Sequence, residues 1–213
     1  MFKSALLEEI DFISHAFLNA MESEGVYDRL PLLRLEQVHG HKVFPCPDTL
    51  PSFRPEADGA VTSSSGIYLS LRTADCVPIL FASCRDKVIG VAHAGWKGAI
   101  SGIVENTLVA MTSLGARRED IFAAIGPCIM PDSYEVKEDF YYACITKDSS
   151  SGAYFPADKK HFDLPGYVAD KIRQAGVSKV NFCGIDTFKD NTFNSYRREK
   201  DNPGRNISYI TIK

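Results

Sequence analysis

Apolar runs bounded by Gly, Ser and Asp predict that much of this chain forms β-strands. We expect strands over residues 32–38, 41–44, 67–71, 77–81, 87–92, 121–125, 180–183 and 207–212. Several of these runs end beside a histidine, a cysteine or a glycine-rich turn. Loops at strand ends commonly carry catalytic and binding side chains, so the same pattern indicates where a functional site would lie.

Three further segments predict helices. In the first, residues 98–114, apolar side chains recur at three- and four-residue steps and form one face, and Gly115 then ends the helix. The second helix is expected over residues 137–145. The third begins after Asp163, whose side chain can cap it, and is closed by Gly176.

The strands come in clusters between the helices and do not alternate with them one for one. This arrangement favours a mixed α+β fold over a doubly wound sheet. Residues 149–152, Ser-Ser-Ser-Gly, look the most flexible but are too short to link two domains. A chain of 213 residues can bury one large core, so we expect a single domain over residues 1–213.

Composition and charge exclude several classes of protein. Apolar residues make up 45% of the chain, which excludes disorder as the main state. A net charge of -3 without a long basic run argues against nucleic-acid binding. Charged residues interrupt every apolar stretch that might span a bilayer, and residues 1–10 carry acids where a signal peptide needs an apolar core. We therefore expect a cytoplasmic protein without a membrane partner, either a monomer or a homodimer.

Six cysteines, at positions 46, 76, 84, 128, 144 and 183, include no Cys-x-x-Cys pair. Disulfides are rare in a chain of this length without a secretion signal, so we expect all of them to be reduced. Most would pack as small apolar residues in the core. Cys128 belongs to that group, whereas Cys76 stands in a more unusual context.

Two histidines and one cysteine stand out by their local strings: His39 in Gln-Val-His-Gly, Cys76 in Thr-Ala-Asp-Cys-Val-Pro, and His93 in Val-Ala-His-Ala-Gly-Trp-Lys-Gly. Two imidazoles and a thiolate suit a tetrahedral Zn²⁺ whose fourth position is left to water, the arrangement of a catalytic site. Their spacing matches no zinc finger, and a lone histidine or cysteine is more often a surface or core residue. The residues alone therefore leave a metal site and ordinary packing as open alternatives.

Further strings occur in order along the chain: Ala57-Asp58-Gly59, Ile125-Gly126-Pro127-Cys128-Ile129, Tyr134-Glu135-Val136 and Ser195-Tyr196-Arg197-Arg198. Together with the three strings above, they resemble the laccase-domain (YfiH-like) family from about residue 32 to the C-terminus. The region before residue 32 is shorter than the usual N-terminal part of that family. The resemblance implies a multilayered α+β sandwich with mixed β-sheets.

The resemblance also implies a function, because the family is regarded as one of purine nucleoside phosphorylases. His39, Cys76 and His93 would bind Zn²⁺, and the substrates would be phosphate with adenosine, inosine or 5′-methylthioadenosine. Deamination of adenosine would be a second activity, for which Zn²⁺ supplies an activated water. The family's older description as multicopper polyphenol oxidases is less favoured, because one mixed cluster in a chain with five histidines cannot build several copper centres.

The catalytic group implied by these strings comprises Cys76, His93 and Asp75. Asp75 precedes the ligand Cys76 and would orient an imidazole or move a proton, although a role in the turn is an equal alternative. A metal-free thiol hydrolase is another alternative, with Cys76 as nucleophile, His93 as base and Asp75 as orienting group. Amide hydrolysis that edits peptidoglycan precursors, and a non-catalytic protein that binds zinc for structure, also remain open.

Phosphorolysis requires cationic donors for phosphate. Lys97, Arg197 and Arg205 are the candidates, with a solvated basic surface as the alternative. Gln37 lies two residues before His39 on the same predicted strand, so it should face the same side and bond a base or ribose. Trp96 could stack on a purine, but a core position is the more common one for tryptophan.

Overall fold

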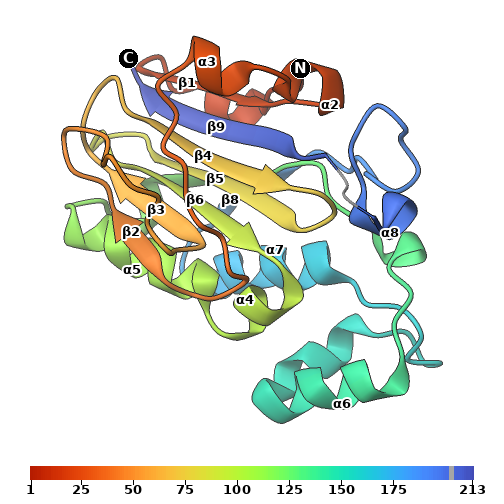
Figure 1. The fold of residues 1–213 in the computed structure, drawn as a ribbon. Coiled ribbons are helices and arrows are strands. Elements are labelled where there is room, and N and C mark those ends of the chain that lie inside the picture. Colours follow the sequence, from red (N-terminus) through yellow and green to blue (C-terminus); the bar gives the residue numbers. More distant parts are fainter. Residues whose placement is uncertain (202–203) are drawn as a thin grey trace.

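Two β-sheets stacked face to face form the centre of the protein, with helices on both outer sides (Figure 1). This arrangement is seen in a computed structural model that describes residues 1–201 and 204–213. Apolar side chains from both sheets meet in a shared core between them. The layered, mixed α+β architecture that the sequence predicts is therefore confirmed.

In the described part of the chain, the smaller sheet is three-stranded and antiparallel, in the order β1 (Ile13–Phe17), β9 (Asn206–Ile212) and β4 (Tyr68–Thr73). The larger sheet is six-stranded, in the order β2 (Val43–Pro45), β3 (Gly59–Thr62), β6 (Ile89–Ala94), β5 (Val77–Ser83), β7 (Ile121–Ile125) and β8 (Lys179–Phe182). Only its two edge pairs, β2 with β3 and β7 with β8, are parallel. The larger sheet is therefore mixed.

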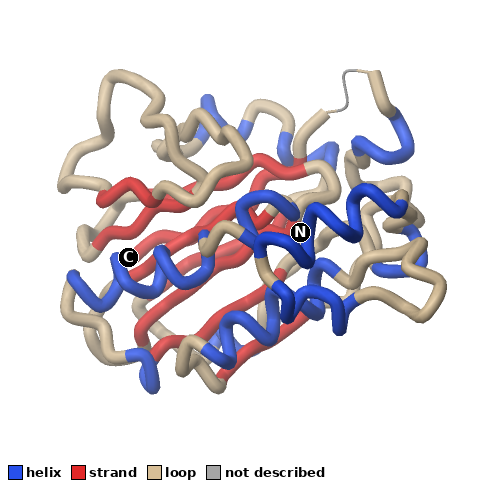
Figure 2. The backbone as a smooth tube through the Cα atoms, turned by 90° about the horizontal axis from the view of Figure 1, so that it is seen from below, coloured by secondary structure: helices blue, strands red, loops and turns tan. Residues whose placement is uncertain are grey.

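Helices cover the outer faces of both sheets. The smaller sheet carries α2 (Ala20–Ser23) and α3 (Val26–Arg29), and α1 (Ala5–Glu8) contacts β1, β7 and β8. The larger sheet carries α5 (Ile103–Ser113) and α7 (Leu164–Gln174), and Figure 2, seen from below, shows helices lying across the strands on this side. Helix α6 (Glu138–Lys147) projects from the body (Figure 1). Short elements complete the chain: α4 (Trp96–Ile100), α8 (Tyr196–Glu199), and the 3-10 turns Arg118–Asp120, Pro131–Ser133 and Ser149–Tyr154.

The central strand β5 is buried along its whole length because both of its faces are covered. Ile79 and Phe81 point to the helix side, where they join the core that α5 and α7 complete. Leu80 and Ala82 point to the opposite side, into the core between the sheets. This alternation follows from the two-residue period of a strand and explains why the segment reads as one continuous apolar run. No helix among the residues that the structure describes is long and apolar enough to cross a membrane.

Helix α7 agrees with its sequence signals. The side chain of Asp163 accepts a hydrogen bond from the backbone N–H of Gly166 at 2.9 Å, and Gly176 adopts a left-handed φ of 94° after the last turn.

The prediction of one helix over residues 98–114 is wrong in one respect. The chain breaks between α4 and α5, where Gly102 has a φ of 93° that a continuous helix cannot contain.

Two other expectations are wrong. Residues 32–38 form no strand and make only isolated bridges at Leu32 and Glu36. Residues 149–152, expected as a flexible loop, belong to a 3-10 turn in which Ser151 is fully buried. Asp148 anchors that turn through the Ser150 N–H and the Lys171 ammonium. Helix α2 is not among the predicted elements, although Asn19 and Glu22 form the capping box that Asn-x-x-Glu indicates.

We expect His15 to make stability depend on pH. It is buried on β1 and its Nε2 accepts the backbone N–H of Ser4 at 2.9 Å, and burial lowers its pKa from 6.5 to about 4. The unfolded chain therefore binds a proton that the folded chain does not between these values, so stability falls as the pH falls. The loss attributable to His15 is about 2 kcal/mol between about pH 7 and pH 4.5.

Denaturant unfolding of the wild type and of His15→Gln at both pH values measures this effect. Glutamine keeps an acceptor for the Ser4 N–H but does not titrate. The wild type should lose more stability than the variant on acidification. Equal losses in the two proteins would contradict the assignment to His15.

Candidate metal centre and substrate cavity

The three residues with unusual strings come together in space. His39 lies in the loop before β2, Cys76 in the turn between β4 and β5, and His93 on β6. One nitrogen of each histidine and the sulfur of Cys76 all lie within 4.8 Å of one another. The centroids of the two imidazole rings are 4.9 Å apart. His93 is buried and His39 is exposed, so the cluster sits at the boundary between core and solvent.

Asp58 organises the two histidines. This carboxylate is fully buried, and its oxygens accept the backbone N–H groups of Val38, His39 and Gly40 at 3.2, 2.9 and 2.7 Å. Its Oδ1 also lies 2.7 Å from Nδ1 of His93. That hydrogen bond leaves Nε2 of His93 for the cluster and fixes the ring orientation. In the sequence, Asp58 stands out only as part of the string Ala-Asp-Gly, and no local signal indicates this role.

Two glycines allow the His39 loop to approach α4. A Cβ atom at Gly98 would lie 2.5 Å from the carbonyl oxygen of Gly40, closer than such atoms can approach. A Cβ atom at Gly95 would lie 2.9 Å from Cδ2 of His39 and 3.1 Å from Sγ of Cys76. His39 itself has a left-handed φ of 60°, which the hydrogen bond from its N–H to Asp58 helps to hold. The cluster therefore depends on the absence of side chains at both glycines.

The electrostatics of the cluster favour a thiolate. Burial by itself would raise the pKa of Cys76, but the positive charge of His93 and hydrogen bonds from both histidines outweigh it and lower the pKa. Burial would likewise lower the pKa of His93, and the neighbouring Cys76 and Asp58 raise it instead. A thiolate and two imidazoles, with a carboxylate behind one imidazole, match the donors of Zn²⁺ sites that leave one position open.

The backbone of Asp75 has a left-handed φ of 85°, a conformation that usually requires glycine. Its Oδ1 accepts the hydroxyl of Thr187 at 2.7 Å, and its Oδ2 accepts the backbone N–H of Arg197 at 2.7 Å. Both oxygens therefore have donors already. This geometry favours a role in joining the Cys76 turn to α8 over the proton transfer considered from the sequence.

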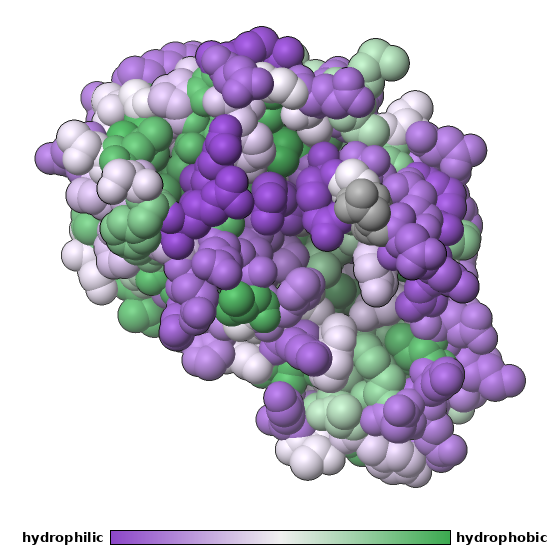
Figure 3. All heavy atoms as spheres, viewed as in Figure 1, coloured by the Kyte–Doolittle hydropathy of each residue, from purple (hydrophilic) through white to green (hydrophobic). Residues whose placement is uncertain are grey.

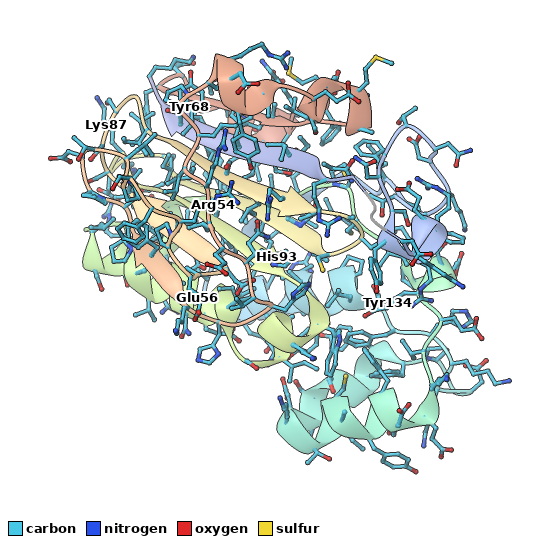
Figure 4. The ribbon with its side chains drawn as sticks, in the orientation of Figure 1. Arg54, Glu56, Tyr68, Lys87, His93 and Tyr134 are labelled. Carbon is cyan, nitrogen blue, oxygen red and sulfur yellow. The ribbon has the colours of Figure 1, made fainter. Side chains whose placement is uncertain are left out.

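A cavity of about 590 Å³ opens beside the cluster. Its lining includes the sequence candidates Gln37, Lys97, Arg197 and Arg205. It also includes Arg72 and Tyr196, which are not among the candidates predicted from the sequence. Hydrophilic residues gather across the middle of this face in Figure 3, and Figure 4 shows His93 there, with Arg54 on one side and Tyr134 on the other.

The cavity candidates have distinct partners. Arg197 donates from Nη1 to the carbonyl of Glu135 at 2.8 Å, and its guanidinium lies 5.3 Å from the ring centroid of Tyr134. Trp96 is half-buried and its ring centroid lies 4.7 Å from that of Phe140, so it both packs on the core and lines the cavity. Lys97 has its ammonium 5.7 Å from the Trp96 ring.

Gln37 is placed differently from the expectation. There is no strand at this position to direct its side chain, and both ends of its amide bond the backbone of Arg72. Gln37 Nε2 donates to the carbonyl of Arg72 and its Oε1 accepts the N–H of Arg72, each at 2.9 Å. The side chain lines the cavity, but its amide is already engaged.

The amino-acid sequence matches a known protein family and named relatives. A model of the family described as multi-copper polyphenol oxidoreductase laccase matches residues 16–213. A purine nucleoside phosphorylase of Rickettsia conorii is 39% identical over 161 residues, which cover 74% of this chain and 66% of the relative. The chain therefore spans just under two thirds of the length of that relative.

Solved structures agree in fold. A Neisseria meningitidis protein superimposes with a TM-score of 0.79 at 30% identity, covering 89% of this chain and 78% of its own. The YfiH protein of Bacillus licheniformis superimposes with a TM-score of 0.83 at 22% identity, covering 97% of this chain and 95% of its own. The family match over most of the chain and the shared fold lead to one conclusion: the chain belongs to the laccase-domain, YfiH-like family.

Proposed function

We propose that this protein is a zinc-dependent purine nucleoside phosphorylase. Its substrates would be phosphate with adenosine, inosine or 5′-methylthioadenosine, and deamination of adenosine would be a second activity. The observation that carries the proposal is the His39, Cys76 and His93 cluster at the wall of a cavity of about 590 Å³ that also presents several cations. A cavity of that size lies in the usual range for small-molecule sites. The name of the Rickettsia relative, a purine nucleoside phosphorylase, supports phosphorolysis as the reaction.

Zn²⁺ held by His39, Cys76 and His93 would act as a Lewis acid towards a substrate oxygen. Asp58 keeps His93 in the orientation that such binding requires. Lys97, Arg197 and Arg205 line the same cavity and would hold phosphate by charge-assisted hydrogen bonds. Trp96 and Tyr134 also line the cavity and would place aromatic side chains beside a bound purine.

Copper-dependent phenol oxidation, which the family description names, is the less favoured metal chemistry. Among the residues described, His39, Cys76 and His93 form the one cluster of this kind. Several copper ions would need more histidine ligands than one such cluster provides.

A metal-free thiol hydrolase is a second candidate, favoured by one specific observation. His93 lies between the carboxylate of Asp58 and the thiol of Cys76, with the hydrogen bond to Asp58 at 2.7 Å. This arrangement resembles a Cys-His-Asp triad, in which Asp58 would replace the Asp75 considered from the sequence. Amide hydrolysis of peptidoglycan precursors would fall in this class. Metal content distinguishes it from the phosphorylase.

Chromatographic product analysis tests the proposed reaction. We expect purified protein to release adenine from adenosine and hypoxanthine from inosine only when phosphate is present, together with ribose 1-phosphate. Inosine formed from adenosine without phosphate would identify the deaminase activity. Inactivity of the zinc-loaded protein towards all three nucleosides would contradict the proposal and favour a binding or hydrolase role.

A further inference from the structure

Arg72 is the cavity cation that the sequence did not single out, and its surroundings distinguish it. It is exposed at the end of β4 and lines the cavity beside the cluster. Across the residues that the structure describes, no ion pair joins its guanidinium to a carboxylate. Arg197, in contrast, already donates from its guanidinium to the carbonyl of Glu135.

The backbone of Arg72 is unusually well fixed for an exposed position. On one side it pairs with Ile207 in the antiparallel ladder of β4 and β9. On the open side of β4, the Gln37 amide bonds both its N–H and its C=O, each at 2.9 Å. A side-chain amide thus takes the place of a neighbouring strand. The Cα atom of Arg72 is therefore held in place, while its guanidinium can reach an anion in the cavity.

Two further guanidinium groups, those of Arg34 and Arg54, act on the same tyrosine as Arg72. Burial raises the pKa of Tyr27, and a hydrogen bond with Ser70 and the positive charges of Arg72, Arg34 and Arg54 act against that rise, so all three guanidinium groups lie within electrostatic range of this tyrosine. Arg34 has its guanidinium 4.2 Å from the Tyr27 ring centroid. Like charges held close together repel each other, and an anion bound among them offsets that repulsion.

The carboxylates of the cavity do not balance this charge. Asp75 is the one carboxylate among the described lining residues, and both of its oxygens already accept hydrogen bonds from Thr187 and Arg197. Apart from the Cys76 sulfur, which belongs to the metal cluster, the described lining therefore offers no anionic group with a free oxygen for Arg72. A guanidinium in this situation suits a phosphate, to which it can donate two parallel hydrogen bonds.

We propose that Arg72 binds the phosphate co-substrate and that Gln37 is the residue that positions Arg72 by clamping its backbone. This inference rests on the proposed phosphorylase function and refines its anion site. Gln37 then acts through Arg72 and makes no contact with base or ribose of its own. Arg34 and Arg54 contribute to the positive potential behind the site.

Phosphate binding and steady-state kinetics test the inference in the zinc-loaded protein. Isothermal titration with inorganic phosphate should show a Kd raised about tenfold or more in Arg72→Gln and less in Arg72→Lys, which keeps the charge but not the fork. The KM for phosphate should rise in parallel, with the KM for inosine within about twofold of wild type. Arg117→Gln, which removes an exposed arginine paired with Asp120 outside the cavity, is the matched control and should bind phosphate normally.

A double-mutant cycle tests the role of Gln37. Gln37→Met keeps the size of the side chain but cannot clamp the backbone, and should raise the KM for phosphate about threefold or more. Added to Arg72→Gln, the same change should have no further effect, because Gln37 acts only through Arg72. A higher KM for inosine with unchanged phosphate binding would show instead that Gln37 contacts the nucleoside.

Failure of this inference can be separated from failure of the proposed function. Phosphate-dependent turnover in the wild type, with unchanged phosphate binding in Arg72→Gln, would overturn the assignment of Arg72 and leave the phosphorylase intact. Phosphate binding that depends on Arg72, without any nucleoside turnover, would overturn the phosphorylase and leave the anion site. Absence of phosphate binding in the wild type would overturn both.

Discussion

Cys76→Ser should abolish both metal binding and nucleoside phosphorolysis. We expect zinc to fall from about one ion per chain to below about a tenth, because a serine hydroxyl is not ionised at neutral pH and is a poor ligand for Zn²⁺. Turnover of inosine in phosphate should fall by about a thousandfold or more. Elemental analysis of the purified proteins and product chromatography measure the two effects.

Cys84→Ser is the matched control, because Cys84 is also a half-buried free thiol but does not line the cavity. It should keep both zinc and activity. Zinc retained by Cys76→Ser would contradict the assigned ligands. A zinc-free wild type that hydrolyses amides and loses that activity on alkylation of Cys76 would establish the thiol hydrolase in place of the phosphorylase.

Asp58→Asn should have the second largest effect, on stability as well as on metal affinity. Asparagine has the same shape, but its NH₂ group cannot accept the N–H groups that the carboxylate now accepts from the His39 loop. Loss of a fully buried, multiply bonded charge beside His93 should destabilise the fold by about 3 kcal/mol. Zinc affinity should fall about 10- to 100-fold.

Denaturant unfolding of the metal-free proteins and competition with a zinc chelator measure these two quantities separately. Glu56→Gln is the matched control, since Glu56 lies two residues away and forms an exposed ion pair with Lys42 at 2.8 Å. Its stability should stay within about 0.5 kcal/mol of wild type. Equal behaviour of the two variants would show that Asp58 does not organise the site.

Elements with complete local signals could be predicted from the sequence. The strand β7 was expected over the residues it occupies, because its apolar run is short and ends at Gly126-Pro127. Helix α7 was likewise found, because Asp163 and Gly176 mark its two ends. In both cases the deciding residues lie within the element or next to it.

Features that depend on distant partners could not be predicted in this way. The apolar pattern of residues 32–38 fits a strand, but Gln37 forms its hydrogen bonds with Arg72, 35 residues away. Asp58 gains its role only when His93 and the His39 loop fold around it. The spacing of His39, Cys76 and His93 does not by itself predict a metal site, and only the strings around them, which resemble a known family, indicate one.

Because His39, Cys76 and His93 lie far apart along the chain, a metal ion bound by all three would couple metal supply to the stability of the fold. An unfolded chain does not bring these ligands together, so an ion bound by the cluster binds the folded state alone. Such binding raises the free energy of unfolding in proportion to the logarithm of the free metal concentration, by about 4 kcal/mol at a thousand times the Kd. The cluster would thus make the abundance of the folded protein a readout of the available metal, independently of any reaction in the cavity.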